Sequence, residues 1–200
     1  MLDTTQEIAS TAARLVVEEG LAFGQAKHRA LKALGLSTRV ALPSNELLEA
    51  EVRDYIALFC ADTQPAELRA LRETARLWMA RLADFHPFLT GAVWHGWATR
   101  RCDVDLTLFC DDPKSAEIAL INQNQSYEAQ TVRGLHGDDI EVLSLHVFCE
   151  GLQEDIGVHL RIYDWDDLRG ALLPDAQGRA PRGDLSALDF LLASTDKNSP

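Results

Sequence analysis

Apolar side chains recur at helical spacing through the first part of the chain, the pattern of helices with one buried face. Two of these stripes end at glycine, which commonly closes a helix, and two follow proline, which commonly opens one. The stripes are Ile8, Ala12, Leu15 and Val16 before Gly20; Phe23, Ala26, Ala30, Leu31 and Leu34 before Gly35; Leu48, Val52, Tyr55, Ile56 and Phe59 after Pro43; and Leu68, Leu71, Ala75, Trp78 and Leu82 after Pro65. The pattern predicts a helix at each stripe.

Beyond Pro87 the apolar positions follow the period of β-strands instead. Residues 103–110 alternate between an apolar side, formed by Val104, Leu106 and Leu108, and a side that begins with two aspartates. The same patterns predict strands at 88–93, 127–132, 140–148 and 158–163, a helix that begins at Asp112 and Pro113, a turn at 134–139 and a short terminal helix near 185–192.

Helices followed by a strand-rich region predict an α+β fold. We expect an N-terminal helical region at 1–86 that packs against an α/β core at 87–193, with a disordered tail at 194–200. A length of 200 residues fits one main core with an extension. With 46% hydrophobic and 25% charged residues the chain is close to the globular average, which argues against disorder and against a fibrous repeat.

The net charge is −12, from 31 acidic and 19 basic side chains. Such a balance repels a polyanion and removes the counterion release that drives unspecific nucleic-acid binding. We therefore expect no bulk binding of DNA or RNA. A small anionic ligand such as a nucleotide stays compatible with the charge, because a metal ion or two local arginines can reverse its sign inside a cleft.

The four cysteines, Cys60, Cys102, Cys110 and Cys149, form no CxxC pair and no zinc-ligand spacing, which favours reduced thiols. The first residues lack the basic start and apolar run of a signal peptide, and no apolar stretch is long enough to cross a membrane. These features predict a cytoplasmic protein without a membrane partner. His136 and His146 have no partner at ligand spacing and are interpreted as structural.

Asp103 and Asp105 lie two positions apart on a predicted strand. Both side chains therefore project from one face of the sheet, with α-carbons about 7 Å apart. Two carboxylates held close together need a compensating cation or donor, and Mg²⁺, which prefers oxygen ligands and bridges phosphates, is the natural candidate. The alternative is that the two aspartates form the solvated face of an edge strand.

The residues from Gly91 to Leu106 resemble the signature of the nucleotidyltransferase superfamily, the DNA polymerase beta-like proteins. That signature is a Gly-Ser loop, a second glycine five residues on, and then Ser-Asp-hydrophobic-Asp-Leu. Here Gly91 and Gly96 match the glycines, Ala98 the small residue, Cys102 the serine, and Asp103 with Asp105 the metal-binding pair. The resemblance implies a nucleotidyltransferase-like mixed β-sheet and Mg²⁺ held by the two aspartates.

The resemblance also implies a triphosphate site at the glycine loop. Its residues are Gly91, Ala92, His95 and Gly96, with Arg100 and Arg101 adding positive charge. Ala92 replaces the family's serine, so one side-chain contact to phosphate is lost. A solvated turn is the alternative for the arginines, and a cap of the turn is the alternative for His95. Trp94 and Trp97 offer either stacking on a base or core packing.

Family enzymes carry a third carboxylate on a later strand, usually as the general base. The run 158–163 looks like that strand with His159 in the place of the carboxylate, and Glu141 is a second candidate on another strand. A neutral histidine can accept a proton or bind a metal, although a histidine on a strand is more often packed or hydrogen-bonded.

Three functions fit these observations. The first is an enzyme that transfers a nucleoside monophosphate from NTP to an unknown small-molecule or protein acceptor, with Mg²⁺ as cofactor. The second is a catalytically inactive nucleotidyltransferase fold that binds a nucleotide or a protein partner. The third is an interaction module built from the N-terminal helices, whose apolar stripes are more often core than interface.

Overall fold

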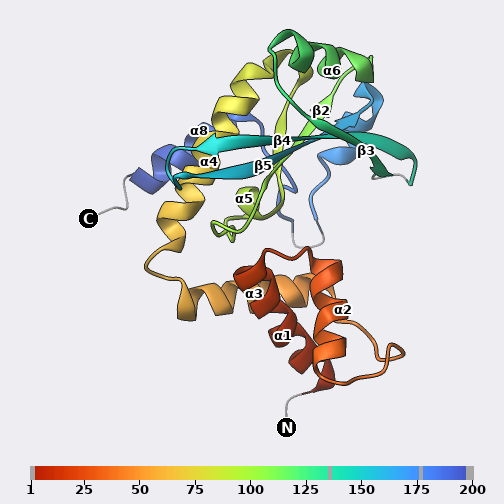
Figure 1. Ribbon diagram of the computed structural model, residues 1–200, viewed down its shortest axis with the longest axis vertical. Helices are drawn as coiled ribbons and strands as arrows, with labels where there is room; N and C mark the ends of the chain where they lie inside the picture. Colours follow the sequence, from red (N-terminus) through yellow and green to blue (C-terminus); the bar gives the residue numbers. More distant parts are fainter. Residues whose placement is uncertain (1–2, 135–136, 176–177, 197–200) are drawn as a thin grey trace. The chain divides into compact units, whose positions relative to one another are not determined.

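The computed structural model describes residues 3–134, 137–175 and 178–196 of the chain. It divides the chain into two compact units, Met1–Pro65 and Ala66–Pro200. Figure 1 shows the helices of the first unit in red to orange and the sheet of the second in green to blue.

The first unit is a bundle of three helices in which α1 packs against both of the others. The helices are α1 (Thr4–Glu19), α2 (Phe23–Ala33) and α3 (Asn45–Phe59). Gly20 ends α1 in the left-handed conformation, with a φ of 71°, and the hydroxyl of Ser44 caps α3 by accepting from the Leu47 N–H at 3.1 Å. The three helices predicted in this part of the sequence are confirmed.

The second unit is built on a five-stranded mixed sheet with the order β1-β2-β5-β4-β3. Strands β2 and β5 are parallel, and the other neighbours are antiparallel. The strands are β1 (Phe88–Thr90), β2 (Val104–Phe109), β3 (Glu128–Arg133), β4 (Asp139–Cys149) and β5 (Glu154–Tyr163), and the longer helices are α4 (Gln64–Arg81), α6 (Pro113–Asn122) and α8 (Leu185–Asp196). The predicted α+β class is confirmed.

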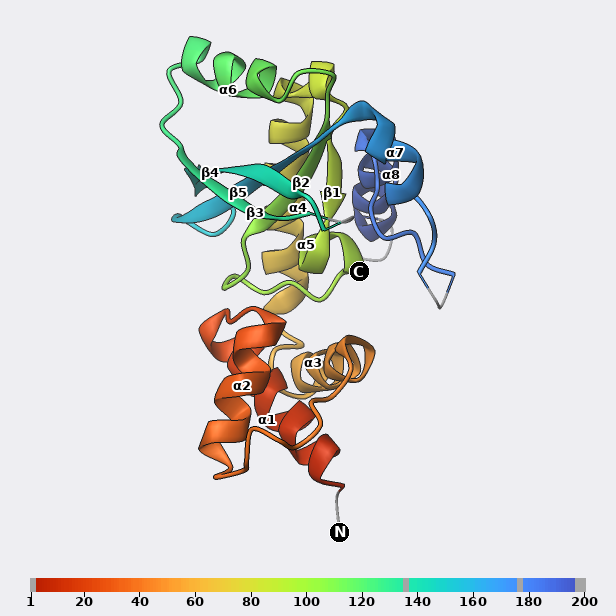
Figure 2. The same cartoon turned by 90° about the vertical axis from the view of Figure 1, so that its right-hand side faces the viewer.

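Three helices share a core with one face of the sheet, which we call the core face. Leu71 of α4, Leu120 of α6 and Leu188 of α8 are fully buried in one cluster with alternate residues of the strands, such as Leu106 and Leu160. The structure therefore groups α4 with the sheet, whereas the region predicted at 1–86 includes it with the other helices before Pro87. Figure 2 shows these helices and the sheet from the side. None of the helices in the described ranges has the length and apolar character needed to span a membrane.

The predicted strand at 88–93 is only half correct, because β1 ends at Thr90 and a short helix, α5 (Gly91–His95), follows it. The chain turns at Gly91, whose φ of 67° takes it out of the strand, a change that a short apolar run does not reveal. Other elements without a sequence prediction are η1 (Ala83–Phe85), η2 (Trp165–Asp167) and α7 (Leu168–Ala171). Helix α8 enters the predicted tail as far as Asp196, while residues 197–200, and residues 135–136 of the predicted turn with His136, lie outside the described residues.

Candidate functional site

Asp103 and Asp105 project from the face of the sheet opposite the core face, which we call the open face. Val104 and Leu106, which alternate with them, are fully buried in the core, whereas the two carboxylate side chains retain 50% and 30% of their exposure. In the register of the sheet Asp105 lies between Thr90 of β1 and His159 of β5. The predicted placement of both carboxylates on one accessible face is thus present in the fold.

The carboxylate of Asp103 is held by strand β5. Its Oδ1 accepts from the backbone N–H of Gly157 at 2.9 Å, and its Oδ2 lies 3.1 Å from Nε2 of His159. A Cβ added to Gly157 would lie 2.6 Å from Cγ of Asp103, closer than a real contact allows. Glycine at 157 therefore gives the carboxylate its position against the β5 backbone.

Asp105 connects the same strand to the glycine turn. Its Oδ1 accepts from Nη2 of Arg161 at 3.1 Å, and a Cβ added to Gly91 would lie 3.4 Å from its Oδ2. The hydroxyl of Thr90 donates to the backbone oxygen of Asp105 at 3.3 Å. The fold thus brings the first glycine of the motif next to the second aspartate.

His159 bridges two strands of the open face. Nδ1 lies 2.9 Å from the hydroxyl of Ser144, which is its register partner on β4, and Nε2 faces Asp103. When the ring is neutral, a proton on Nε2 donates to the carboxylate and Nδ1 accepts from the hydroxyl. The sequence placed His159 near the aspartates correctly, whereas Ser144 was missed because nothing in the local sequence marks a register partner.

The two groups of this pair change each other's pKa. The hydrogen bond to Asp103 raises the pKa of His159 above its ordinary 6.5, against the lowering by burial, and the hydrogen bond from His159 lowers the pKa of Asp103 below 3.8. The stabilisation from His159 is complete below pH 6.5 and is lost as the pH rises through its raised pKa. That from Asp103 is present above pH 3.8 and is lost as the pH falls through its lowered pKa. The pair is therefore most favourable in mildly acidic solution.

Replacing Asp103 by asparagine is expected to lower the pKa of His159, because the main group that raises it is gone while burial still lowers it. Titration of the imidazole signal by NMR measures the change. Asp139→Asn, at the exposed start of β4, is the matched control and should leave that signal unchanged. An identical His159 titration in the Asp103 variant would show that the two side chains do not interact in solution.

The end of the glycine loop is held by Arg72 of α4. Its Nε donates to the carbonyl of Val93 at 3.1 Å and its Nη2 to that of Trp94 at 3.3 Å, so the guanidinium satisfies carbonyls at the end of α5. Gly96, with a φ of 84°, passes close to the same guanidinium. Burial lowers the pKa of Arg72. This residue was not singled out from the sequence, because α4 and the loop are far apart along the chain.

The remaining loop candidates lie in or beside α5. Ala92 is in its first turn, and its carbonyl accepts from the Gly96 N–H at 2.9 Å, while His95 is the last residue of the helix and is half-buried. The indole of Trp94 donates to the carbonyl of Ala180 at 2.9 Å, and its ring lies against Gly183. For Trp94 the structure therefore shows packing against the chain that follows α7.

Arg100 and Arg101 precede β2 at an exposed turn. The guanidinium of Arg100 forms two hydrogen bonds to the carboxylate of Glu154, at 2.9 and 3.2 Å, and its backbone N–H donates to Glu67 at 3.0 Å. The ion pair with Glu154 raises the pKa of Arg100. Arg100 is thus engaged by a carboxylate at the start of β5, and Arg101 contributes positive charge near the same carboxylate.

Glu141 is not brought together with the aspartates. Its neighbours Val142 and Ser144 pair with Arg161 and His159 of the open face at even positions of β4, so Glu141 belongs to the other set of positions. Its carboxylate accepts from Lys114 of α6 at 3.0 Å, on the side of the sheet where α6 packs. The interpretation of Glu141 as the third carboxylate of the site therefore lacks the required geometry.

Asp103 and Asp105 fit Mg²⁺ by ligand type, because this ion is commonly bound by one or two carboxylates together with substrate phosphates. A metal site made wholly of side chains needs at least three such ligands close together. Within residues 3–134, 137–175 and 178–196, no three His, Cys, Asp or Glu side chains are grouped so that they could hold a metal. Two carboxylates can contribute to a shared metal site here, and substrate would have to complete it.

No protein-family model and no curated protein matches the chain. Similar solved structures include Cid1 poly(U) polymerase with MgGTP bound, at 19% identity and a TM-score of 0.33, covering 50% of this chain and 32% of that one. Cid1 with the UTP analogue UMPNPP is 17% identical, with a TM-score of 0.32, and the match covers 69% of this chain and 37% of that one. A cytoplasmic RNA terminal U-transferase is 18% identical, with a TM-score of 0.31, and the match covers 69% of this chain and 37% of that one. The chain spans about a third of the length of these structures. At such TM-scores the activity has to be argued from the residues of the chain itself.

Proposed function

We propose that the open face around Asp103 and Asp105 binds NTP with Mg²⁺ and transfers the nucleoside monophosphate to an acceptor hydroxyl on a small molecule or a protein. The observation that carries the proposal is the placement of two partly exposed carboxylates on one face, beside the positive-φ turn at Gly91. The four cysteines are free thiols, which suits the reducing cytoplasm that we propose as its location.

The side chains around the pair have distinct proposed roles. Asp103 and Asp105 would hold Mg²⁺, which neutralises triphosphate charge when bound. Arg161, now paired with Asp105, can turn its guanidinium to a phosphate oxygen. His159 lies beside Asp103 on the open face, and in its neutral form the imidazole could accept the proton of the acceptor hydroxyl. The acceptor oxygen bonds to the α-phosphorus, the bond to the bridging oxygen breaks, and pyrophosphate leaves.

A second candidate, a nucleotide-binding protein without turnover, is favoured by a different observation. Both carboxylates already have positive or N–H partners on β5, namely the Gly157 N–H, His159 and Arg161. Such partners compensate the negative charge without a metal. By its resemblance to the nucleotidyltransferase strand, the run 158–163 has His159 where the family has its third carboxylate, which would leave two acidic groups instead of three.

Incubation with α-labelled NTP separates the two candidates. The transferase predicts Mg²⁺-dependent release of pyrophosphate and transfer of label to an acceptor in a metabolite or protein extract, and chelation by EDTA should stop both. The binding protein predicts NTP affinity, measured by calorimetry, that is the same with Mg²⁺ and with EDTA and no pyrophosphate. Absence of both NTP binding and pyrophosphate release would exclude the two candidates together.

A further inference from the structure

One part of the sheet edge lacks a neighbouring strand. Strand β3 pairs with β4 only from Asp139 to Ser144, whereas β5 pairs with β4 as far as Cys149. In the described part of the chain, no strand pairs with the outer edge of residues 145–149. This stretch, Leu-His-Val-Phe-Cys, contains no proline and no charged residue, the usual means by which an edge is protected. The edge is therefore suited to pairing with another strand.

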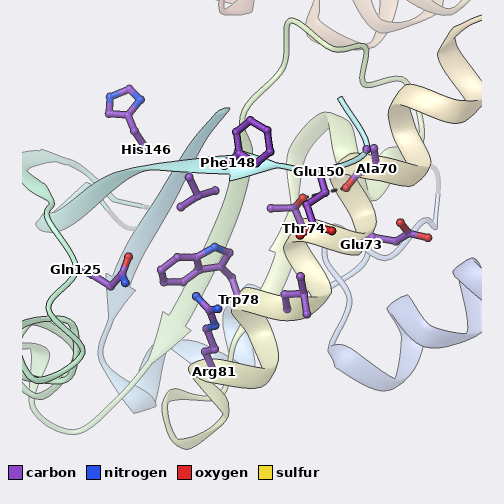
Figure 3. Close-up of a pocket in the computed structure, with 12 residues that line it drawn as sticks. Ala70, Glu73, Thr74, Trp78, Arg81, Gln125, His146, Phe148 and Glu150 are labelled. Carbon is purple, nitrogen blue, oxygen red and sulfur yellow. Dashed lines mark hydrogen bonds between the residues drawn. The ribbon is translucent and has the colours of Figure 1, made fainter. Parts of the chain in front are cut away.

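A groove of about 430 Å³ runs below this edge, between β4 and helix α4. Figure 3 shows it with Trp78 and Thr74 of α4 on one side and the strand that carries His146 and Phe148 on the other. Phe148 and Leu77, which lines the groove from α4, are each 58% exposed. Two large apolar side chains thus lie open to solvent beside unpaired backbone.

Helix α4 contributes a stripe whose charges are opposite at its two ends. Glu73, Leu77 and Arg81 all line the groove, and their spacing of four residues keeps them on one side of the helix over about 12 Å. Leu77 is at the centre, with a negative side chain before it and a positive one after it. A second copy of this stripe, rotated by 180° about an axis through Leu77, would place its Arg81 opposite Glu73 and its Glu73 opposite Arg81.

Helix α4 and residues 145–149 of β4 run in opposite directions along the groove. The hydroxyl of Thr74 lies 3.3 Å from Sγ of Cys149, and Ala70 lies against Gly151, so the middle of α4 lies beside the end of β4. Figure 3 shows Arg81 at the opposite end of the groove from Glu73 and Glu150. Leu77 is the central residue of the stripe formed by Glu73, Leu77 and Arg81, as Val147 is the central residue of 145–149. One twofold axis can therefore relate both elements to a second copy.

We propose that this edge, residues 145–149 together with Glu73, Leu77 and Arg81, binds the same edge of a second copy of the chain. The two β4 strands pair antiparallel about Val147 and continue the sheet from one protomer into its partner. Across the axis Glu73 lies against the partner's Arg81, and Leu77 against the partner's Leu77. Glu73 also accepts from Arg69 on its own helix at 2.9 Å, and this exposed carboxylate has oxygens for both arginines.

The contact is small, since it comprises a five-residue strand edge and one stripe of a helix. It has far fewer residues than the roughly 20 to 30 per partner of a standard interface, so a transient dimer is expected, with a Kd on the order of 10 to 100 µM. Dimerisation should therefore appear only at high protein concentration. The pairing uses none of the side chains that bind Asp103 or Asp105, although His146 lies close enough to lower the pKa of Asp103. The variants at Glu73, Leu77 and Arg81, all on α4, therefore test the pairing separately from the nucleotide proposal.

Sedimentation velocity of the full chain, from about 1 to 300 µM, tests the pairing. Arg81→Glu is expected to weaken association at least 10-fold, because it places two carboxylates together on each side of the axis. The double variant Glu73→Lys with Arg81→Glu reverses both charges and should restore association. Leu77→Glu should abolish it, whereas Leu58→Glu, at an exposed apolar position of α3, is the matched control and should not alter it.

Recovery of the dimer in the double variant supports the proposal, since a merely structural effect of either substitution would not be reversed by the other. A chain that stays monomeric throughout overturns it, and the edge is then left for an extended segment of another protein. A dimer that is indifferent to Arg81→Glu and to Leu77→Glu also overturns it, because another surface must then form the contact.

Discussion

Replacing Asp105 by alanine is expected to lower nucleotidyl transfer about 100-fold or more while the fold is retained. The carboxylate lies against the Gly91 turn, where the motif would seat a triphosphate. The variant loses its partly exposed ion pair with Arg161, which contributes at most about 1 kcal/mol to stability. Rates of pyrophosphate release report the first effect, and circular dichroism with thermal unfolding reports the second.

Asp139→Ala provides the matched control. Asp139 is also a strand aspartate beside an arginine, Arg133 at 3.7 Å, but it lies at the start of β4 away from Asp105. Its removal should leave both activity and thermal stability unchanged. Full turnover in the Asp105 variant would refute the assignment of the open face as a transferase site.

Local patterns were sufficient to predict the long elements of the fold. The stripe that begins at Leu48 corresponds to α3, where Leu48, Val52 and Ile56 are buried. The alternation from residue 103 to 110 corresponds to β2, whose apolar side is buried in the same way. The cap at Asp112 also begins α6 as expected, by accepting from the Lys114 N–H at 3.0 Å. Short elements such as α5 and α7 carry less than two periods of any pattern, which is why the sequence did not reveal them.

The site was predictable only where its residues are close in sequence. The aspartate pair and the glycine turn could be proposed together because Gly91 and Asp105 belong to one continuous motif. Arg161 and Gly157, which hold the two carboxylates, come from the parallel neighbour β5, and their assignment requires the register of the sheet. Glu141 was proposed from its residue type, but it lies one position out of phase with Val142 and Ser144 on β4. Its side chain is therefore on the core face and not on the open face.

Residues of β5 compensate the negative charge of both aspartates, and this compensation bears on the choice between the transferase and the binding protein. On the open face β5 places Gly157, His159 and Arg161 at successive positions, and the first two bind Asp103 while the third binds Asp105. Any cation that enters must compete with these partners. A bound triphosphate would ease that competition by giving Arg161 an anionic alternative. We therefore expect metal and nucleotide to bind more tightly together than either does alone.

Replacing Gly183 by alanine is expected to lower the free energy of unfolding of the second unit by about 2 to 3 kcal/mol. The added methyl would lie 2.1 Å from two ring carbons of Trp94. Neither side can move freely, because Gly183 exchanges backbone hydrogen bonds with Leu89 at 2.8 and 3.0 Å and the indole donates to Ala180 at 2.9 Å. Thermal unfolding followed by tryptophan fluorescence should show a midpoint lower by about 5 to 10 °C.

All four tryptophans lie in the second unit, so their fluorescence reports on the unit that contains Gly183. Gly24→Ala in α2 is the matched control, because a Cβ there meets nothing within 4 Å and alanine favours a helix. It should leave the fluorescence transition at the same temperature. An unchanged midpoint in the Gly183 variant would mean that the contact between Trp94 and the segment after α7 is loose in solution. That segment would then contribute little to the position of α5.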